Sequence, residues 1–304
     1  MRVCLMVEGQ EGVTWERWVA LARACDALGF EALFRSDHYL SVQGDQSRGS
    51  LDAWATLAAL APLTERIRLG TLVSPATFRH PSVLAKMVAT VDHVSGGRAE
   101  LGLGAGWLEA EHRAYGFPFA GVGERFDVLA EQLEIVHRSW TEGPFSFRGE
   151  HYEIGELDAL PKPVQRPHPN LIMGGNAGPR AAALAARWAD EYNTVFATAE
   201  ECRARRAAIA EACEVAGREP LPFSLMTGFV VGADDDEIAR RARALGQDPA
   251  ALPPAWITGT PDDVVARLRE LEEAGVERVM LQHLAHDDDA ALELLGREVV
   301  PRCA

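Results

Sequence analysis

The sequence predicts an α/β protein that folds as a closed (β/α)8 TIM barrel, and we treat residues 1–304 as a single domain. Two observations carry this prediction. Eight apolar segments alternate with stretches of helical periodicity, and most of them are apolar throughout, as strands buried on both faces of a parallel sheet are. Eight is also the number of strands that closes this barrel. An open, doubly wound sheet is the alternative that the same alternation allows.

The predicted strands are short runs rich in β-branched and other apolar residues. Between them, residues 14–29 carry apolar side chains at spacings of three and four and end at a glycine, which is typical of an amphipathic helix. Residues 81–97 begin with a proline and end in a glycine pair, and residues 260–275 begin with a threonine cap followed by acids. The strands are expected at residues 3–8, 31–36, 67–73, 99–104, 170–175, 191–196, 222–232 and 276–282.

One segment interrupts this alternation. Residues 142–168 are rich in proline and show no long apolar period, so they fit neither a barrel strand nor a barrel helix. We expect an insertion between the fourth helix and the fifth strand that covers one end of the barrel.

Composition and charge exclude several classes of function. A formal net charge of −15 at pH 7 predicts repulsion of nucleic acid and of anionic membranes. The apolar residues 51–63 are too short and too mixed a stretch to span a bilayer, and the N-terminus is a poor secretion signal. Five scattered cysteines without a CxxC spacing argue against a zinc site or a disulfide framework. We expect a cytoplasmic protein without a bound metal.

A TIM barrel places its active site at the C-terminal ends of its strands, so the search narrows to these positions. Gly102, Gly104 and Gly106 end the fourth predicted strand. Their G-x-G-x-G spacing and their place on that strand do not match a dinucleotide fingerprint. They can fit a crowded barrel interior, or they can leave backbone N–H groups open to a flat ring or a phosphate. The other strand-end residues are Glu8, Ser36, Asp37, His38, residues 73–78, Trp107, residues 174–178 and His283.

Two further candidates have plain structural interpretations. Residues 283–289 combine two histidines with three aspartates, but acids suit the start of the final helix better than a metal site. Arg79 can meet an anionic substrate or a cofactor tail, or form a salt bridge to a neighbouring helix. No P-loop, GxSxG or HExxH motif occurs, which weakens phosphoryl-transfer, hydrolase and zinc-protease interpretations.

Three stretches together carry a resemblance to a known family: FRSDHYL at 34–40, the continuous block 68–119, and LIMGGNAGPRAAALAARWADEYN at 171–193. They resemble the luciferase-like monooxygenase superfamily, and within it the branch that uses the deazaflavin coenzyme F420. The resemblance covers nearly the whole chain and is most specific in the block 68–119. It implies a (β/α)8 barrel with an insertion after the fourth helix, in agreement with the strand count.

The resemblance also implies site residues at the ends of the second and third strands. Asp37 and His38 match the pair that faces the central ring of the deazaflavin. Leu72, Val73 and Ser74 match the end of the third strand, where the family has a bulge with a cis peptide that supports the ring from behind. We place that bond near Leu72–Val73.

The remaining implied residues belong to two glycine-rich loops. The loop after the fourth strand lies at the ring and side chain of the cofactor in this family, and the loop after the fifth strand lies at its tail and phosphate. An anion at the start of the following helix agrees with the helix dipole. The cofactor-binding residues expected in these loops are Gly104, Ala105, Gly106, Gly174, Gly175 and Asn176.

One residue departs from the family pattern. Family members that oxidise a sugar phosphate carry a glutamate directly after the fourth-strand glycines, where this chain has Trp107. Glu109 and Glu111 follow, but they are not equivalent in position. We therefore expect Trp107 to line a substrate pocket, and we do not carry over sugar-phosphate dehydrogenase activity.

The sequence as a whole predicts an F420-dependent oxidoreductase that moves a hydride between the deazaflavin and a small organic substrate. His38 is the candidate general acid and base, because an imidazole can serve in either direction near neutral pH, and Asp37 can orient it or cap a neighbouring backbone. An FMN-dependent monooxygenase and a non-catalytic binding protein are the alternatives. The resemblance implies a homodimer, with residues 51–63 and 81–95 as plausible contact faces.

Overall fold

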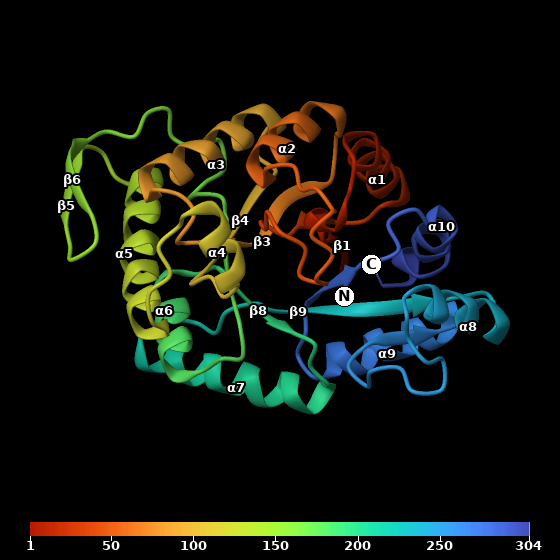
Figure 1. Cartoon of the computed structure of the whole chain (residues 1–304). Coiled ribbons are helices and arrows are strands. Elements are labelled where there is room, and N and C mark those ends of the chain that lie inside the picture. The colour runs from red at the N-terminus through yellow and green to blue at the C-terminus, as the bar shows by residue number, and fades with distance from the viewer. Residues whose placement is uncertain (304) are drawn as a thin grey trace.

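The computed structural model describes residues 1–303 and shows a closed barrel of eight parallel strands surrounded by helices (Figure 1). Neighbouring strands pair in the order β9, β11, β1, β2, β3, β4, β7, β8, and β8 pairs again with β9. That last pairing closes the sheet, so the barrel prediction is confirmed and the open-sheet alternative is excluded. The barrel strands are β1 (Arg2–Val7), β2 (Ala32–Arg35), β3 (Arg68–Pro75), β4 (Ala99–Gly104), β7 (Asn170–Gly174), β8 (Glu191–Val195), β9 (Phe223–Val231) and β11 (Arg278–Gln282).

Three helices begin or end at the signals that the sequence predicts. Thr14 and Thr260 cap α1 and α9 through their side chains, and Gly96 ends α3 in a left-handed conformation, which glycine adopts without steric cost. The helices are α1 (Trp15–Leu28), α2 (Ala53–Leu60), α3 (Pro81–Ser95), α4 (Glu109–Tyr115), α5 (Val122–Thr141), α6 (Pro179–Trp188), α7 (Ala199–Val215), α8 (Asp235–Ala244), α9 (Pro261–Glu273) and α10 (Asp289–Glu298).

The barrel interior is filled by side chains and not by an open pore. Inward-facing apolar residues from several strands form one buried cluster, while the opposite faces of the strands pack on the helices, as the two-residue alternation of a strand requires. The interior cluster consists of Cys4, Met6, Ala32, Phe34, Leu72, Ile172, Met226 and Met280. Met1 and Cys303 meet at the end of the barrel where β1 begins, and the Met1 amino group donates to the Cys303 carbonyl oxygen at 2.9 Å.

The insertion lies on the flank of the barrel. It contains an antiparallel hairpin, β5 (Phe145–Arg148) with β6 (Glu153–Leu157), at the outer edge of the molecule beside α5 (Figure 1). Glu131 on α5 accepts backbone N–H groups of the hairpin turn, and Asp92 on α3 accepts those of Val164 and Gln165. The expectation that the insertion covers one end of the barrel is therefore wrong for the hairpin, whose polar groups are satisfied by helices.

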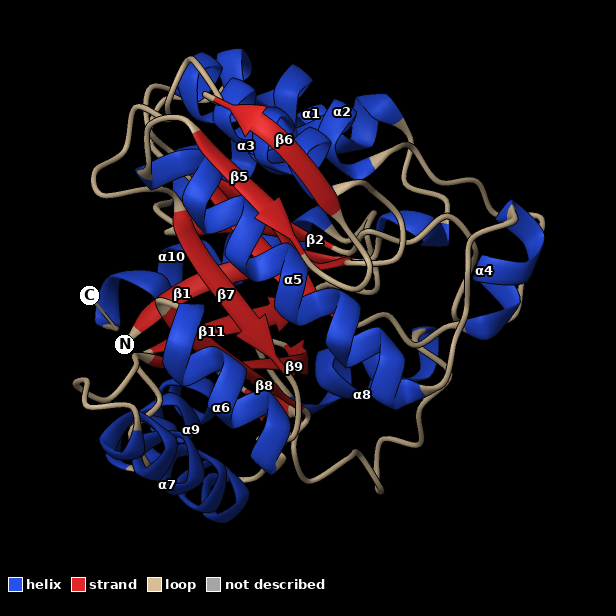
Figure 2. Ribbon diagram, turned by 90° about the vertical axis from the view of Figure 1, so that its left-hand side faces the viewer, coloured by secondary structure: helices blue, strands red, loops and turns tan. Residues whose placement is uncertain are grey.

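Two smaller features complete the fold. A three-residue strand, β10 (Ile257–Gly259), pairs with β9 outside the closed barrel. Figure 2 shows the barrel from the side, with α5 and α6 across the strands. None of the helices described within residues 1–303 is long and apolar enough to cross a membrane.

Candidate active site

His38 lies just after β2, at the C-terminal mouth of the barrel, and is held by a carboxylate from another element. Its Nδ1 lies 2.8 Å from Oε2 of Glu111, on the short helix α4. The Glu111 side chain is completely buried, and its other oxygen accepts the backbone N–H groups of Tyr39 and Leu40. The carboxylate therefore fixes both the imidazole and the chain that follows it.

The surroundings of His38 favour its protonated form. Burial lowers the pKa of His38, but the hydrogen bond and charge of Glu111, with the charges of Glu8 and Asp37, raise it above the ordinary value of 6.5. Burial also raises the pKa of the Glu111 carboxyl, but the hydrogen bond and charge of His38 and the two N–H donors lower it below 4.5. The pair thus favours an imidazolium beside a carboxylate.

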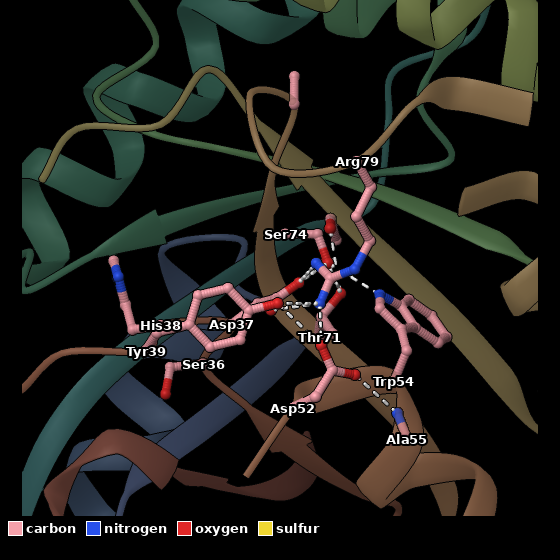
Figure 3. Close-up of polar contacts among 12 residues, drawn as sticks. Ser36, Asp37, His38, Tyr39, Asp52, Trp54, Ala55, Thr71, Ser74 and Arg79 are labelled. Atoms are coloured by element: carbon pink, nitrogen blue, oxygen red, sulfur yellow. Dashed lines mark hydrogen bonds and ion pairs between the residues drawn. The ribbon is translucent and has the colours of Figure 1, made fainter. Parts of the chain in front are cut away.

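Asp37 belongs to a separate polar cluster, behind the end of β3. Its carboxylate, which is fully buried, accepts two hydrogen bonds from the Arg79 guanidinium at 2.5 and 3.1 Å and one from Ser74 Oγ at 2.6 Å. Arg79 also pairs with Asp52 at the start of α2. Figure 3 shows the His38 side chain pointing away from this cluster. Among residues 1–303, Asp37 neither hydrogen-bonds His38 nor caps a neighbouring backbone. Arg79 forms salt bridges, which was one of the two roles considered for it.

The end of β3 carries the expected irregularity. The Leu72–Val73 peptide bond is cis, as we placed it, and the register of β3 against β4 shifts between Thr71 and Ser74. The Ser74 hydroxyl faces inward, accepting from the Trp54 indole N–H at 3.0 Å and donating to Asp37. The Ser74 side chain is therefore enclosed in the wall, and Val73 remains half-exposed at the mouth.

Val73 explains why glycines occupy the end of β4. A Cβ atom at Gly102 would meet the Thr71 carbonyl oxygen and lie 2.8 Å from Val73 Cγ1, and one at Gly104 would lie 2.8 Å from Val73 Cγ2. Gly102 and Gly104 are both buried. The crowded-interior interpretation thus holds for these two glycines, which make room for the bulge.

The next residues of this loop are more open. Ala105 and Gly106 are half-buried, and Gly106 has φ of 79°, a conformation that favours glycine. Trp107 follows with 62% of its surface exposed, and its ring meets that of His38 edge-on with centroids 5.5 Å apart. The indole therefore lies beside His38, and its role as the wall of a substrate pocket stays a prediction.

The loop after β7 leads into the start of α6. Gly174 and Gly175 are half-buried and Asn176 is exposed. The Tyr192 hydroxyl accepts the Ala177 N–H at 3.0 Å and so anchors the turn, while Gly178 begins α6 without a side-chain cap. The first N–H groups of α6 are available to an anionic group.

His283 does not join the His38 cluster. It is buried, stacks on Phe229 with centroids 5.7 Å apart, and its pKa is lowered to about 3, chiefly by burial. Within the following segment, Asp288 accepts the Ala291 N–H at the start of α10, which confirms the capping interpretation for this residue. Asp287 and Asp289 instead pair with Arg17.

These residues fit a flat heterocycle with a phosphorylated tail. The half-exposed Val73 on the β3 bulge offers an apolar support, His38 Nε2 has no protein partner among residues 1–303, and the start of α6 has free N–H groups. A flavin or deazaflavin has the matching parts: an apolar ring face, ring polar atoms and a phosphate.

Glu111 is the functional candidate that the sequence did not reveal. The short helix α4 turns it inward while Glu109, two residues earlier, pairs with Arg113 in solvent. The signal available was slight: an acid in the first turn of the short helix that follows Trp107. Nothing local shows that the face is turned toward His38.

The chain matches the luciferase-like monooxygenase family over residues 3–253. It is 27% identical to the FMNH2-dependent dimethylsulfone monooxygenase of Pseudomonas putida, covering 92% of this chain and 86% of that one. It is also 27% identical to the F420-dependent glucose-6-phosphate dehydrogenase of Amycolatopsis mediterranei, covering 93% of each. A monooxygenase from Streptomyces bottropensis has the same fold, with a TM-score of 0.83, 25% identity and full coverage of both chains.

These relatives use either a flavin or the deazaflavin, so they support a cofactor of this kind and leave the choice between the two open. The two relatives from Pseudomonas putida and Amycolatopsis mediterranei are named for small-molecule substrates. All three proteins are oxidoreductases by name. The protein is an oxidoreductase, and it belongs to the luciferase-like monooxygenase family.

Proposed function

We propose that the protein is an F420-dependent oxidoreductase acting on a small, uncharged organic substrate. The observation that carries this proposal is the position of His38, whose Nδ1 is occupied by Glu111 and whose Nε2 has no partner among the described residues. When bound, the deazaflavin supplies a two-electron hydride carrier. His38 Nε2 gives or takes the proton that accompanies the hydride.

The other site residues hold the cofactor and exclude water. We assign Leu72 and Val73 to the support behind the ring, and Ala105 with Gly106 to the loop beside it. Asp37 acts through the Arg79 pair, which fixes the chain leading to His38. The loop of Gly174, Gly175 and Asn176 would hold the cofactor tail, and the first N–H groups of α6 would hold its phosphate.

Ion pairs in the loops after β2 and β3 support an uncharged substrate. Arg79 is held by Asp37 and Asp52, and Arg48 is held by Glu11 and Asp45. Neither guanidinium is free to bind a phosphate or carboxylate. Trp107 offers an apolar surface instead.

The relatives also support a second candidate, an FMN-dependent monooxygenase, because the dimethylsulfone enzyme matches 92% of the chain. Titration of the purified protein with F420 and, separately, with FMN distinguishes the two, with binding followed by fluorescence. We expect micromolar binding of F420. Binding of FMN without binding of F420 contradicts the proposal and favours the monooxygenase.

We further propose a cytoplasmic homodimer that uses α2 and α3. Val83 and Val94 on α3 are 53% and 48% exposed, and their spacing of 11 residues puts both on one face of the helix. Light scattering after size exclusion should show a dimer that Val83→Glu dissociates. The control Val215→Glu, on an 86% exposed residue of α7, should leave the mass unchanged; a monomeric wild-type protein contradicts the proposal.

A further inference from the structure

We propose that Glu111 is the positioning residue of the site: it keeps a proton on His38 Nδ1 and thereby leaves Nε2 as the atom that exchanges protons with the substrate. This inference deepens the proposed function and rests on it only for the identity of the group that Nε2 meets. The pairing itself rests on the geometry of His38 and α4.

Glu111 is built to stay an anion in a fixed orientation. The carboxylate is completely buried, with one oxygen on His38 Nδ1 at 2.8 Å and the other accepting from Tyr39 N–H and, at 3.0 Å, from Leu40 N–H. A buried charge is tolerated where it is paired and hydrogen-bonded in this way. Turning the carboxylate away from the imidazole would also break its hydrogen bonds to these two backbone N–H groups.

The chemistry of the two groups decides where the proton lies. An ionised carboxylate only accepts hydrogen bonds, so the 2.8 Å contact requires that Nδ1 carry the hydrogen. The proton that comes and goes near neutral pH is then the one on Nε2. When His38 gives the proton, the N–H bond at Nε2 breaks and the substrate atom that faces Nε2 gains the proton. The imidazolium becomes neutral and keeps its Nδ1 hydrogen.

The other charged groups around His38 are already committed elsewhere. Glu8, at the end of β1, accepts from Gln282 Nε2 at 2.6 Å and from Gln10 Nε2 at 2.8 Å, and Asp37 is held by Arg79. Both contribute charge to the site, but of the acids described within residues 1–303 only Glu111 hydrogen-bonds the imidazole. Glu111 thus decides which nitrogen of His38 carries the hydrogen, while the charges of Glu8 and Asp37 only raise the pKa of the imidazole.

The same helix supplies a matched control. Glu109 lies two residues before Glu111, is exposed, and pairs with Arg113 at 2.9 Å. Glu109→Gln removes one negative charge from α4, as Glu111→Gln does, but touches neither His38 nor the backbone after β2. A difference between the two variants therefore reports the buried contact and not the charge of the helix.

The test is nitrogen NMR of protein labelled with 15N-histidine, without added cofactor, with the His38 signals assigned from their loss in His38→Ala. In the wild-type protein we expect the Nδ1–H tautomer and a pKa above 6.5. In Glu111→Gln the pKa should fall below 6.5, because burial remains while the charge is gone. In Glu109→Gln the tautomer and the pKa of His38 should both be unchanged. An Nε2–H tautomer in the wild-type protein, or the same pKa in Glu111→Gln, overturns the proposal.

Turnover provides the second readout. With the cofactor that binds, kcat of Glu111→Gln should fall on the order of tenfold or more, as when the partner of a catalytic histidine is removed, and KM should change little. The acidic or basic limb of the kcat–pH profile should move with the NMR pKa. If the wild-type protein does not bind F420, the proposed function is wrong, but the NMR result on Glu111 still holds because it needs no cofactor. The failure of the proposed function and the failure of the role of Glu111 are therefore distinguishable.

Discussion

At the scale of single residues, the proton chemistry depends on His38. Replacing it by alanine removes the group that gives or takes the proton, and we expect kcat to fall about 100-fold or more, while cofactor binding stays measurable. His93→Ala is the control, because His93 is exposed in the last turn of α3, remote from the mouth. Stopped-flow turnover and fluorescence titration measure the two effects. Unchanged turnover in His38→Ala removes the role we assign to it.

The Asp37–Arg79 pair makes a prediction about stability. Arg79→Ala leaves the fully buried Asp37 carboxylate without its counter-charge, so the free energy of unfolding should fall by about 3 kcal/mol or more. Arg113→Ala breaks only the exposed pair with Glu109 and should cost less than about 1 kcal/mol. Urea unfolding of both variants tests this. Equal losses would show that the buried pair contributes no more than a surface one.

At the scale of elements, the β3 bulge and the end of β4 are shaped to each other. Gly104→Ala places a methyl group against Val73 Cγ2, at 2.8 Å, and should destabilise the fold by about 1–3 kcal/mol through overpacking. Val73→Ala removes that methyl, so the double variant should recover part of the loss. Gly102→Ala meets the Thr71 carbonyl oxygen instead, and Val73→Ala should not rescue it to the same extent. Additive losses at Gly104 and Val73 would contradict this account.

At the scale of the whole molecule, a buried ionic cluster ties the N-terminal ends of the strands together. Arg278 on β11 bonds Glu100 on β4 at 2.8 and 3.1 Å and Glu191 on β8 at 3.1 Å. Burial alone would raise the pKa of Glu100, but Arg278 and then Arg68 bring it down to about 2. Burial raises the pKa of Glu191. In a TIM barrel this end serves stability.

This cluster predicts a dependence of stability on pH. The folded-state pKa of Glu100 lies below its ordinary value of 4.5, so its contribution is complete above pH 4.5 and is lost as the pH falls toward 2. The raised pKa of Glu191 acts in the opposite sense, but only above pH 4.5. Urea unfolding between pH 5 and 2.5 should show a steep loss that is shallower in Glu100→Gln. The exposed control Glu109→Gln should keep the wild-type slope, and an equally steep loss in Glu100→Gln contradicts the assignment.

The sequence predicts the fold well because the strands and helices of the barrel are marked by local sequence patterns. All eight strands lie where apolar runs are expected, and helices such as α9 start at the expected cap, Thr260. Apolar runs, helical periods and caps depend on neighbours along the chain, so they survive without tertiary information. The sequence identifies residues 142–168 as an insertion but does not show where it lies on the barrel. Its polar groups bond to α3 and α5, and its own residues do not specify these partners.

The sequence by itself determined the parallel barrel, the strand ends that form its mouth, and, through the family resemblance, the residues His38, Leu72–Val73 and the two glycine loops. Only the tertiary structure decided their partners. Glu111 meets His38 across 73 residues, and Arg278 meets Glu100 across 178, while Asp37 turns to Arg79. Such contacts arise when barrel closure brings distant strand ends together, and no pattern along the chain records which side chains then face each other.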